Sequence, residues 1–233
     1  MKVFAVNIGT KYGPEYDEYI KRKLSKYDVH IIKEPYDPKV ILQWNKMYPM
    51  SLDIDEPVCV IDIDILLVND YYELFEHSIK RGQFVALGSW WNPDLNINGG
   101  FFKYYPKDCR YIFDKFTIEP DYWMRHYIKK GVTVGPVNGE QFFVKESVEE
   151  RLELVRTPEA WCTRWMADDV STITRFNKFE DWHVSMVQRY RETTGNNYIY
   201  LGGEFHPDIK LVHFTHALNK PHEWKDYEQF KTD

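Results

Sequence analysis

The stretch EPVCVIDIDILLVNDYYELFE (residues 56–76) places two aspartates, Asp62 and Asp64, inside the most apolar run of the chain. Ionised carboxylates are rarely buried unless they are paired or bind a metal. Side chains two residues apart on a β-strand point to the same face, so both carboxylates reach one edge of a sheet if the strand ends here. Such a pair suits Mg²⁺ or Mn²⁺ bound together with substrate phosphates. A pair of solvated turn aspartates or helix N-caps is the alternative.

Alternating apolar segments and turn signals predict an α/β fold around this stretch. The early order β-α-β-α-β predicts a mostly parallel central sheet flanked by helices. We expect one domain over residues 1–233, with a polar, irregular segment at 166–197 as a mobile loop. Strands are expected at 2–8, 29–35, 56–68, 83–89, 96–106, 151–165 and 209–216, and helices at 15–27, 38–52, 69–82, 107–130 and from 139 onward.

The composition is that of an ordinary globular protein, with 43% hydrophobic and 28% charged residues. The net charge of −6 argues against a nucleic-acid partner. The three cysteines have no metal-ligand spacing, which predicts reduced thiols and a cytoplasmic location. The N-terminus lacks the features of a signal peptide, and no window is apolar enough to span a bilayer, so we expect no membrane span.

Five segments together resemble the GT-A-fold glycosyltransferases, particularly family 8, the group of glycogenin and the galactosyltransferases. The resemblance covers about residues 2–224 and is carried by the order of its motifs. They are WNKMYP (44–49), VIDIDILLVNDYYELF (60–75), NINGGFF (96–102), NGEQFFV (138–144) and VHFTHALNKPHEW (212–224).

The sequence departs from the family pattern in two motifs. The closing motif is one residue longer between His213 and Lys220, it lacks a glycine, and it carries the additional His222. The acid-Gln motif has Glu140 in place of the usual aspartate. The departures in the closing motif predict a diphosphate loop of different shape.

The resemblance implies that Asp62, Asp64 and His213 bind Mn²⁺, with Mg²⁺ as the alternative ion. Such an ion neutralises the leaving nucleoside diphosphate, and Lys220 adds a second positive charge. A core or surface histidine and a solvated surface lysine are the alternatives for His213 and Lys220.

The resemblance also implies a donor site and a sugar site. Tyr12 would stack on uracil, although it could instead pack in the core, and Gly9 could serve only a turn. Glu140 would stabilise the anomeric centre from its back face, or it could be an acid that complements a helix dipole. The expected donor-binding residues are Asn7, Gly9, Thr10, Tyr12, Lys46, Asp62, Ile63, Gly99 and Lys220, and the expected catalytic residues are Asn98, Glu140 and Gln141.

The polar-aromatic segment GSWWNPDLN (88–96) offers an acceptor platform. Trp90 and Trp91 would stack on a sugar and Asp94 would accept hydrogen bonds from its hydroxyl groups, but core packing of the tryptophans is the alternative. The segments 165–169 and 180–183 are candidates for a loop that closes over the donor.

We therefore expect a metal-dependent glycosyltransferase that transfers a hexose from a nucleotide sugar. The resemblance implies UDP-glucose or UDP-galactose as donor and retention of configuration. Slow donor hydrolysis would follow from the same chemistry if acceptor binding is poor. The acceptor, a saccharide, a protein or a small molecule, is not indicated. A metal-dependent nucleotidyltransferase or phosphohydrolase, or a non-catalytic carbohydrate-binding module, are the alternatives.

Overall fold

A computed structural model describes residues 1–92, 94–165, 181–214, 220–224 and 226–231. For residues 181–187 it describes the backbone alone. The contacts between Cα atoms divide the chain into two compact units. The first comprises Met1–Ile63, Ser78–Ala86 and Ile97–Val155, and the second comprises Asp64–His77, Leu87–Asn96 and Arg156–Asp233. The expectation of one catalytic domain over the whole chain stays a prediction.

The first unit is built on a six-stranded sheet with the order β2-β1-β3-β6-β5-β7. Strand β1 pairs in parallel with β2 and β3, and β3 pairs antiparallel with β6. The α/β fold class with a mostly parallel central sheet is therefore confirmed. The strands are β1 (Lys2–Val6), β2 (Asp28–Ile32), β3 (Val58–Ile61), β5 (Gln83–Gly88), β6 (Ile97–Tyr104) and β7 (Glu153–Arg156).

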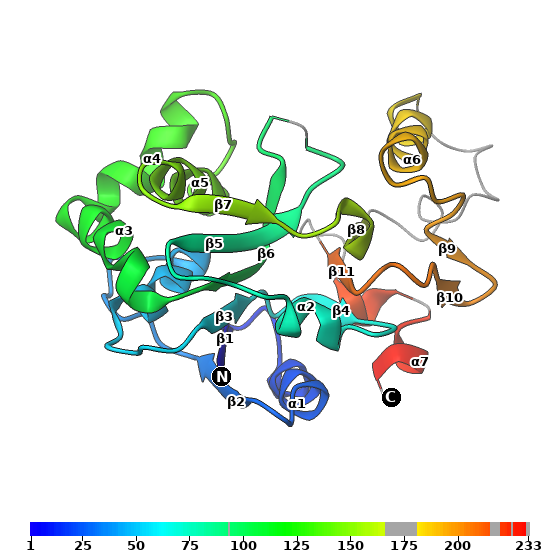
Figure 1. Ribbon diagram of the computed structural model, residues 1–233, viewed down its shortest axis with the longest axis horizontal. Coiled ribbons are helices and arrows are strands. Elements are labelled where there is room, and N and C mark those ends of the chain that lie inside the picture. Colours follow the sequence, from blue (N-terminus) through cyan, green and yellow to red (C-terminus); the bar gives the residue numbers. More distant parts are fainter. Residues whose placement is uncertain (93, 166–180, 215–219, 225, 232–233) are drawn as a thin grey trace. The chain divides into compact units, whose positions relative to one another are not determined.

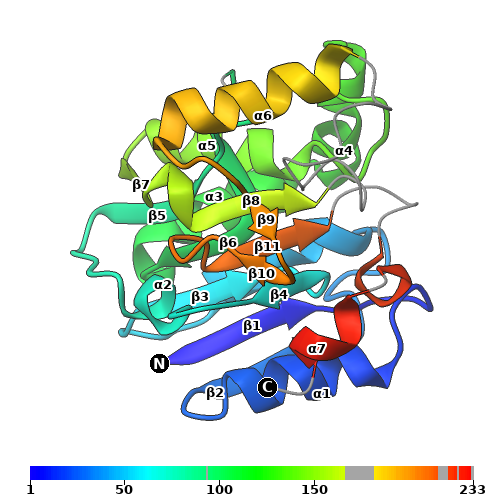
Figure 2. The same cartoon turned by 90° about the vertical axis from the view of Figure 1, so that its right-hand side faces the viewer.

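Helices flank this sheet, and α3, α4 and α5 lie together at one side of it (Figure 1). Trp44, in the 3₁₀ segment η1, packs against these helices. Its ring centroid lies 5.1 Å from that of Phe116 and 5.9 Å from that of Phe143. Figure 2 shows α1 running beside β1, as expected of a crossover between parallel strands. The elements are α1 (Pro14–Lys23), η1 (Leu42–Ser51), α3 (Pro106–Ile118), α4 (Pro120–Lys129) and α5 (Glu140–Glu149).

The second unit is built on a three-stranded sheet in which β11 lies between β4 and β8 (Figure 2). Strand β11 runs parallel to β8 and antiparallel to β4. An aromatic cluster that includes Trp165, Tyr200, Phe205 and Trp224 fills the core of this unit. The elements are β4 (Ile65–Leu67), α2 (Tyr72–Glu76), η2 (Glu159–Trp161), β8 (Cys162–Trp165), α6 (Asp181–Thr194), β9 (Tyr200–Leu201), β10 (Glu204–Phe205), β11 (Leu211–Phe214), η4 (Pro221–Glu223) and α7 (Tyr227–Lys231).

Five segments differ from the sequence prediction. The segment 151–165, expected as a strand, contains two strands, β7 and β8, with the 3₁₀ turn η2 between them. The strand expected at 56–68 is two strands, because a paired strand would have to desolvate both aspartates. The helix expected at 38–52 is the 3₁₀ segment η1, which contains Pro49. Within 69–82 only Tyr72–Glu76 is α-helical, and within 166–197 residues 181–194 form α6 while 166–180 lie outside the described residues. In the described part of the chain, no helix is both long and apolar enough to cross a membrane.

Candidate active site

The two aspartates lie in the break between β3 and β4, and neighbouring strands hold the backbone on both sides of it. The Asp62 N–H donates to the Gly100 carbonyl oxygen at 3.1 Å, which continues the β3–β6 ladder by one residue. The Phe214 N–H donates to the Asp64 carbonyl oxygen at 3.1 Å. Because β4 pairs antiparallel with β11, Ile65 lies opposite His213, and Asp64 is thereby brought next to the histidine.

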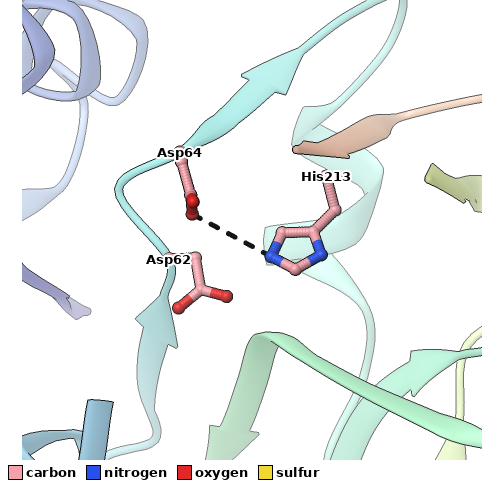
Figure 3. A group of neighbouring side chains, drawn as sticks. All are labelled: Asp62, Asp64 and His213. Atoms are coloured by element: carbon pink, nitrogen blue, oxygen red, sulfur yellow. Dashed lines mark ion pairs between the residues drawn. The ribbon is translucent and has the colours of Figure 1, made fainter. Parts of the chain in front are cut away.

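Asp64 and His213 form a half-buried pair within the second unit. The distance from His213 Nε2 to Asp64 Oδ1 is 3.9 Å, and the two side chains are 12% and 16% exposed. Asp62 precedes Asp64 by two positions in the chain, and one ligand atom of each of the three residues lies within 4.8 Å of the others (Figure 3).

The three side chains fit a divalent cation. Two ligands of one such ion, each about 2.1–2.2 Å from it, are at most about 4.4 Å apart, so a small inward rotation closes the set. Two carboxylates and one imidazole suit Mn²⁺ or Mg²⁺ with phosphate oxygens as further ligands. Sequence reasoning therefore found three residues that the structure brings together.

Lys46 is a buried cation within the first unit. Its ammonium group lies 2.5 Å from Asp62 Oδ1, donates to the Gly99 carbonyl oxygen at 2.8 Å and lies 3.7 Å from Glu140 Oε1. The side chain is 3% exposed. A buried ion is tolerated only when partners compensate its charge, and Lys46 compensates two carboxylates at once. Its contact with a donor stays a prediction.

The residues expected to line the sugar gather around the same lysine. Gly99 donates its N–H to Gln141 Oε1 at 3.2 Å, and the Asn98 side-chain oxygen accepts from the Gly100 N–H at 2.8 Å. Glu140 begins α5 and is 4% exposed. A Cβ atom at position 99 would lie 3.4 Å from both Glu140 Oε2 and Lys46 Nζ, so the glycine allows the acid and the lysine to approach the backbone.

The residues expected to hold the nucleoside lie at the exit of β1. The buried Asn7 amide donates to Asp17 Oδ1 at 2.7 Å. Gly9 has a φ of +92°, which favours glycine and matches the turn alternative. Thr10 is exposed, and the Tyr12 ring packs against Tyr16 with centroids 4.9 Å apart. Nucleoside binding by these residues stays a prediction.

The predicted acceptor platform has a mixed outcome. Trp90 is 3% exposed, and its Nε1–H donates to the Cys162 carbonyl oxygen at 2.9 Å. It therefore packs in the core, which is the alternative that the sequence left open. Trp91 is half-buried and Asp94 is exposed. Of the loop segments expected to close over the donor, residues 166–180 lie outside the described residues.

The closing motif contributes Lys220, and sequence reasoning missed Arg164. Lys220 lies just before η4, and its ammonium group pairs with Glu223 Oε1 at 3.2 Å. Arg164 lies opposite His213 in the parallel β8–β11 pair, and burial lowers the pKa of its guanidinium. The segment expected as a strand at 151–165 also contains Arg151 and Arg156, so no local signal in it singles out Arg164.

Comparison with solved structures identifies the fold. No protein-family model matches the sequence, and no curated protein matches it. The glycosyltransferase GlyE of Streptococcus pneumoniae TIGR4 matches with a TM-score of 0.60 and 12% identity, and the match covers 100% of this chain and 60% of GlyE.

Two further structures match over nearly their whole length. The galactosyltransferase LgtC, in complex with donor and acceptor sugar analogues, has a TM-score of 0.58 at 10% identity, covering 99% of this chain and 95% of LgtC. A glycosyltransferase involved in glycosylation of the major capsid of PBCV-1 has a TM-score of 0.57 at 14% identity, covering 99% of this chain and 98% of that one. The chain has the fold of these glycosyltransferases, which confirms the predicted GT-A fold; membership of family 8 stays a prediction.

Proposed function

We propose that this protein is a metal-dependent glycosyltransferase that uses a nucleotide sugar. One observation carries the proposal: the Asp62, Asp64 and His213 cluster occurs at a strand end in a fold shared with glycosyltransferases. The carboxyl ends of strands are where open α/β sheets bind ligands. Shared fold alone does not imply shared activity, so the cluster is the necessary second support.

The metal centre would stabilise the negative charge of the leaving group. When bound, Mn²⁺ or Mg²⁺ would supply positive charge that stabilises the departing diphosphate. Asp62, Asp64 and His213 would hold the ion. The Lys46 ammonium group pairs with the Asp62 carboxylate at 2.5 Å and so restrains it, and Lys220 would neutralise a phosphate oxygen once it leaves Glu223.

The residues around Gly99 would hold the sugar. Glu140 is buried beside Lys46 and would stabilise positive charge that develops at the anomeric carbon. Asn98 and Gln141 would position the sugar hydroxyl groups. We propose retention of configuration with Glu140 on the back face of the sugar.

UDP is the proposed nucleotide, and glucose or galactose is the proposed sugar. The Tyr12 ring lies at the exit of β1 and offers an aromatic face for uracil. The solved galactosyltransferase of the same fold supports a hexose donor. Transfer to water, at a low rate, would follow from the same chemistry when no acceptor is bound.

Donor turnover tests the proposal. A panel of nucleotide sugars is incubated with the protein, with and without Mn²⁺, and release of the nucleoside diphosphate is measured. We expect metal-dependent release from one UDP-sugar, with at least about a 100-fold loss in Asp64→Ala. Asp53→Ala is the matched control, since Asp53 is 93% exposed and lies away from the cluster in sequence.

Three outcomes would contradict the proposal. Turnover without metal, or equal turnover by Asp64→Ala, would remove the metal assignment. Release of pyrophosphate or inorganic phosphate in place of UDP would indicate a nucleotidyltransferase or phosphohydrolase. Sugar binding without any turnover would indicate a carbohydrate-binding module.

A further inference from the structure

Exposed apolar side chains concentrate on one segment of the first unit. Among the described residues, the exposed large hydrophobic side chains number six, and four of them lie between positions 118 and 134. Val134 is 98% exposed and Ile118 is 78% exposed, while Tyr122 and Val132 are each 45% exposed. Single exposed apolar residues are common, but such a concentration marks an interaction surface.

From Tyr122 onward this segment is basic in an acidic protein, whereas Glu119 and Asp121 precede it. Residues 122–139 include Arg125, Lys129 and Lys130 but no aspartate or glutamate, although the whole chain has a net charge of −6. Tyr122, Arg125 and Lys129 are spaced three and four residues apart on α4, so they share one exposed face, and the exposed Asp121 lies at its N-terminal edge. Among the residues that the structure describes, no ion pair involves Arg125 or Lys129, whereas Lys130 lies 3.7 Å from Glu146.

The opposite face of α4 is fixed to the protein. Met124 and Tyr127 are buried there, and α4 contacts α3 and α5 (Figure 1). The helix therefore presents its basic and aromatic face outward without having to detach.

Hydrogen bonds also hold the loop that follows α4. The Tyr127 carbonyl oxygen accepts from the N–H groups of Val132 and Thr133 at 2.9 and 3.3 Å. On the other side of Val134, the Pro136 carbonyl oxygen accepts from Trp44 Nε1–H at 2.6 Å. The loop is thus fixed at both ends, and Val132 and Val134 are held away from the core. We call Tyr122, Arg125, Lys129, Val132 and Val134 the α4 surface.

We propose that the α4 surface docks on an anionic lipid bilayer. The valines would enter the boundary between headgroups and acyl chains, and Tyr122 would lie at the headgroup level, where aromatic rings with a polar end are favoured. Arg125 and Lys129 would contact the anionic headgroups while their stems cover apolar surface. This inference goes beyond the proposed function and does not rest on it.

Local positive charge supports a bilayer as the occupant of the α4 surface. A protein with a net charge of −6 is repelled by an anionic membrane except where its positive charge is local, and the α4 surface provides that local charge. The loop leads directly into Glu140, the first residue of α5, so a docked surface would adjoin the helix that carries candidate catalytic residues.

Vesicle co-sedimentation tests this proposal. The full chain is mixed with vesicles of phosphatidylglycerol and phosphatidylcholine in equal parts, and with vesicles of phosphatidylcholine alone. We expect binding to the anionic vesicles that weakens as salt is raised. Arg125→Gln/Lys129→Gln should bind about 25-fold more weakly, at about fivefold for each charge removed. Val132→Ser/Val134→Ser should weaken binding by at least about tenfold.

Matched controls separate docking from a general effect. Leu201→Ser removes an apolar side chain that is also 45% exposed, and Lys21→Gln/Arg22→Gln removes two exposed charges from α1. Both should bind like wild type. Circular dichroism and urea unfolding confirm that each variant is folded.

Three results would overturn the inference. They are absence of wild-type binding to anionic vesicles, equal binding by the α4 surface variants, and a dimer in solution that Val132→Ser/Val134→Ser dissociates. The last would assign the surface to a second copy. Donor turnover in vesicle-free buffer reports separately on the proposed function.

Discussion

At the scale of single residues, the positive charge of Lys46 compensates two largely buried carboxylates of the candidate site. Asp62 and Glu140 are both largely buried, and each would be costly to ionise without a nearby cation. Lys46 lies between them and also satisfies the Gly99 carbonyl oxygen. One ammonium group therefore restrains both a candidate metal ligand and a candidate catalytic carboxylate.

Replacing Lys46 should cost the fold more than replacing an exposed lysine. Lys46→Met leaves two buried carboxylates without their cation, and we expect the free energy of unfolding to fall by about 3–5 kcal/mol. Lys107→Met is the matched control, because Lys107 is 41% exposed and pairs with Asp53 at the surface. Its effect should stay within about 0.5 kcal/mol. Urea unfolding measures both, and an equally small effect at position 46 would contradict this account.

At the scale of elements, the register between β4 and β11 assembles the metal cluster. Ile65 lies opposite His213, so the pairing of β4 with β11 places Asp64 beside the histidine.

The end of β5 packs closely against the backbone of Thr157. The Gly88 N–H donates to Thr157 Oγ1 at 3.2 Å, and a Cβ atom at position 88 would lie 2.8 Å from the Thr157 carbonyl oxygen.

Gly88→Ala should therefore destabilise the protein. The new methyl group would meet backbone, which cannot rotate away, and we expect a loss of about 1–3 kcal/mol in the free energy of unfolding. Gly135→Ala is the control, since a Cβ atom there meets nothing within 4 Å and its φ is not in the left-handed region. Thermal unfolding of the two variants decides the matter. A Gly88→Ala protein as stable as Gly135→Ala would show that β5 and Thr157 are not packed this closely.

Local sequence signals predicted some elements well and others poorly. The continuous apolar run at β1 and the helical spacing at α1 were sufficient, because each element follows from its own residues. The break between β3 and β4 and the helix α6 were missed, because apolar content continues through the first and polar content hides the second. The Asp62, Asp64 and His213 set was found through motif order, whereas Arg164 depends on a pairing between strands that no local pattern reports.

At the scale of the whole molecule, three buried thiols report on the integrity of both units. Cys59 and Cys109 belong to the first unit and Cys162 to the second, and all three are free and buried. Burial raises the pKa of the Cys59 thiol to about 12, and it also raises the pKa of Cys109 and Cys162. The thiolate is the reactive form, so these thiols are protected twice, by burial and by protonation.

We expect no thiol to react with an aromatic disulfide reagent at pH 8 in the native protein, and all three to react in urea. The folded pKa values lie above the unfolded value of 9.0, so the unfolded chain loses thiol protons first as the pH rises. Stability is therefore full below pH 9 and falls as the pH rises toward 12, by up to about 1.4 kcal/mol per pH unit for each thiol. Rapid native labelling, or unfolding midpoints that do not change between pH 8 and 10.5, would contradict this.

The central claim is that Asp62, Asp64 and His213 hold a divalent ion that binds a nucleoside diphosphate. Calorimetric titration with UDP tests it most directly, with Mn²⁺ present or removed by a chelator, and uridine serves as the ligand without phosphates. We expect UDP binding that weakens at least about tenfold on chelation and equally in His213→Ala, while uridine binding does not respond to the metal. UDP affinity that is unchanged both by the chelator and by His213→Ala would contradict it.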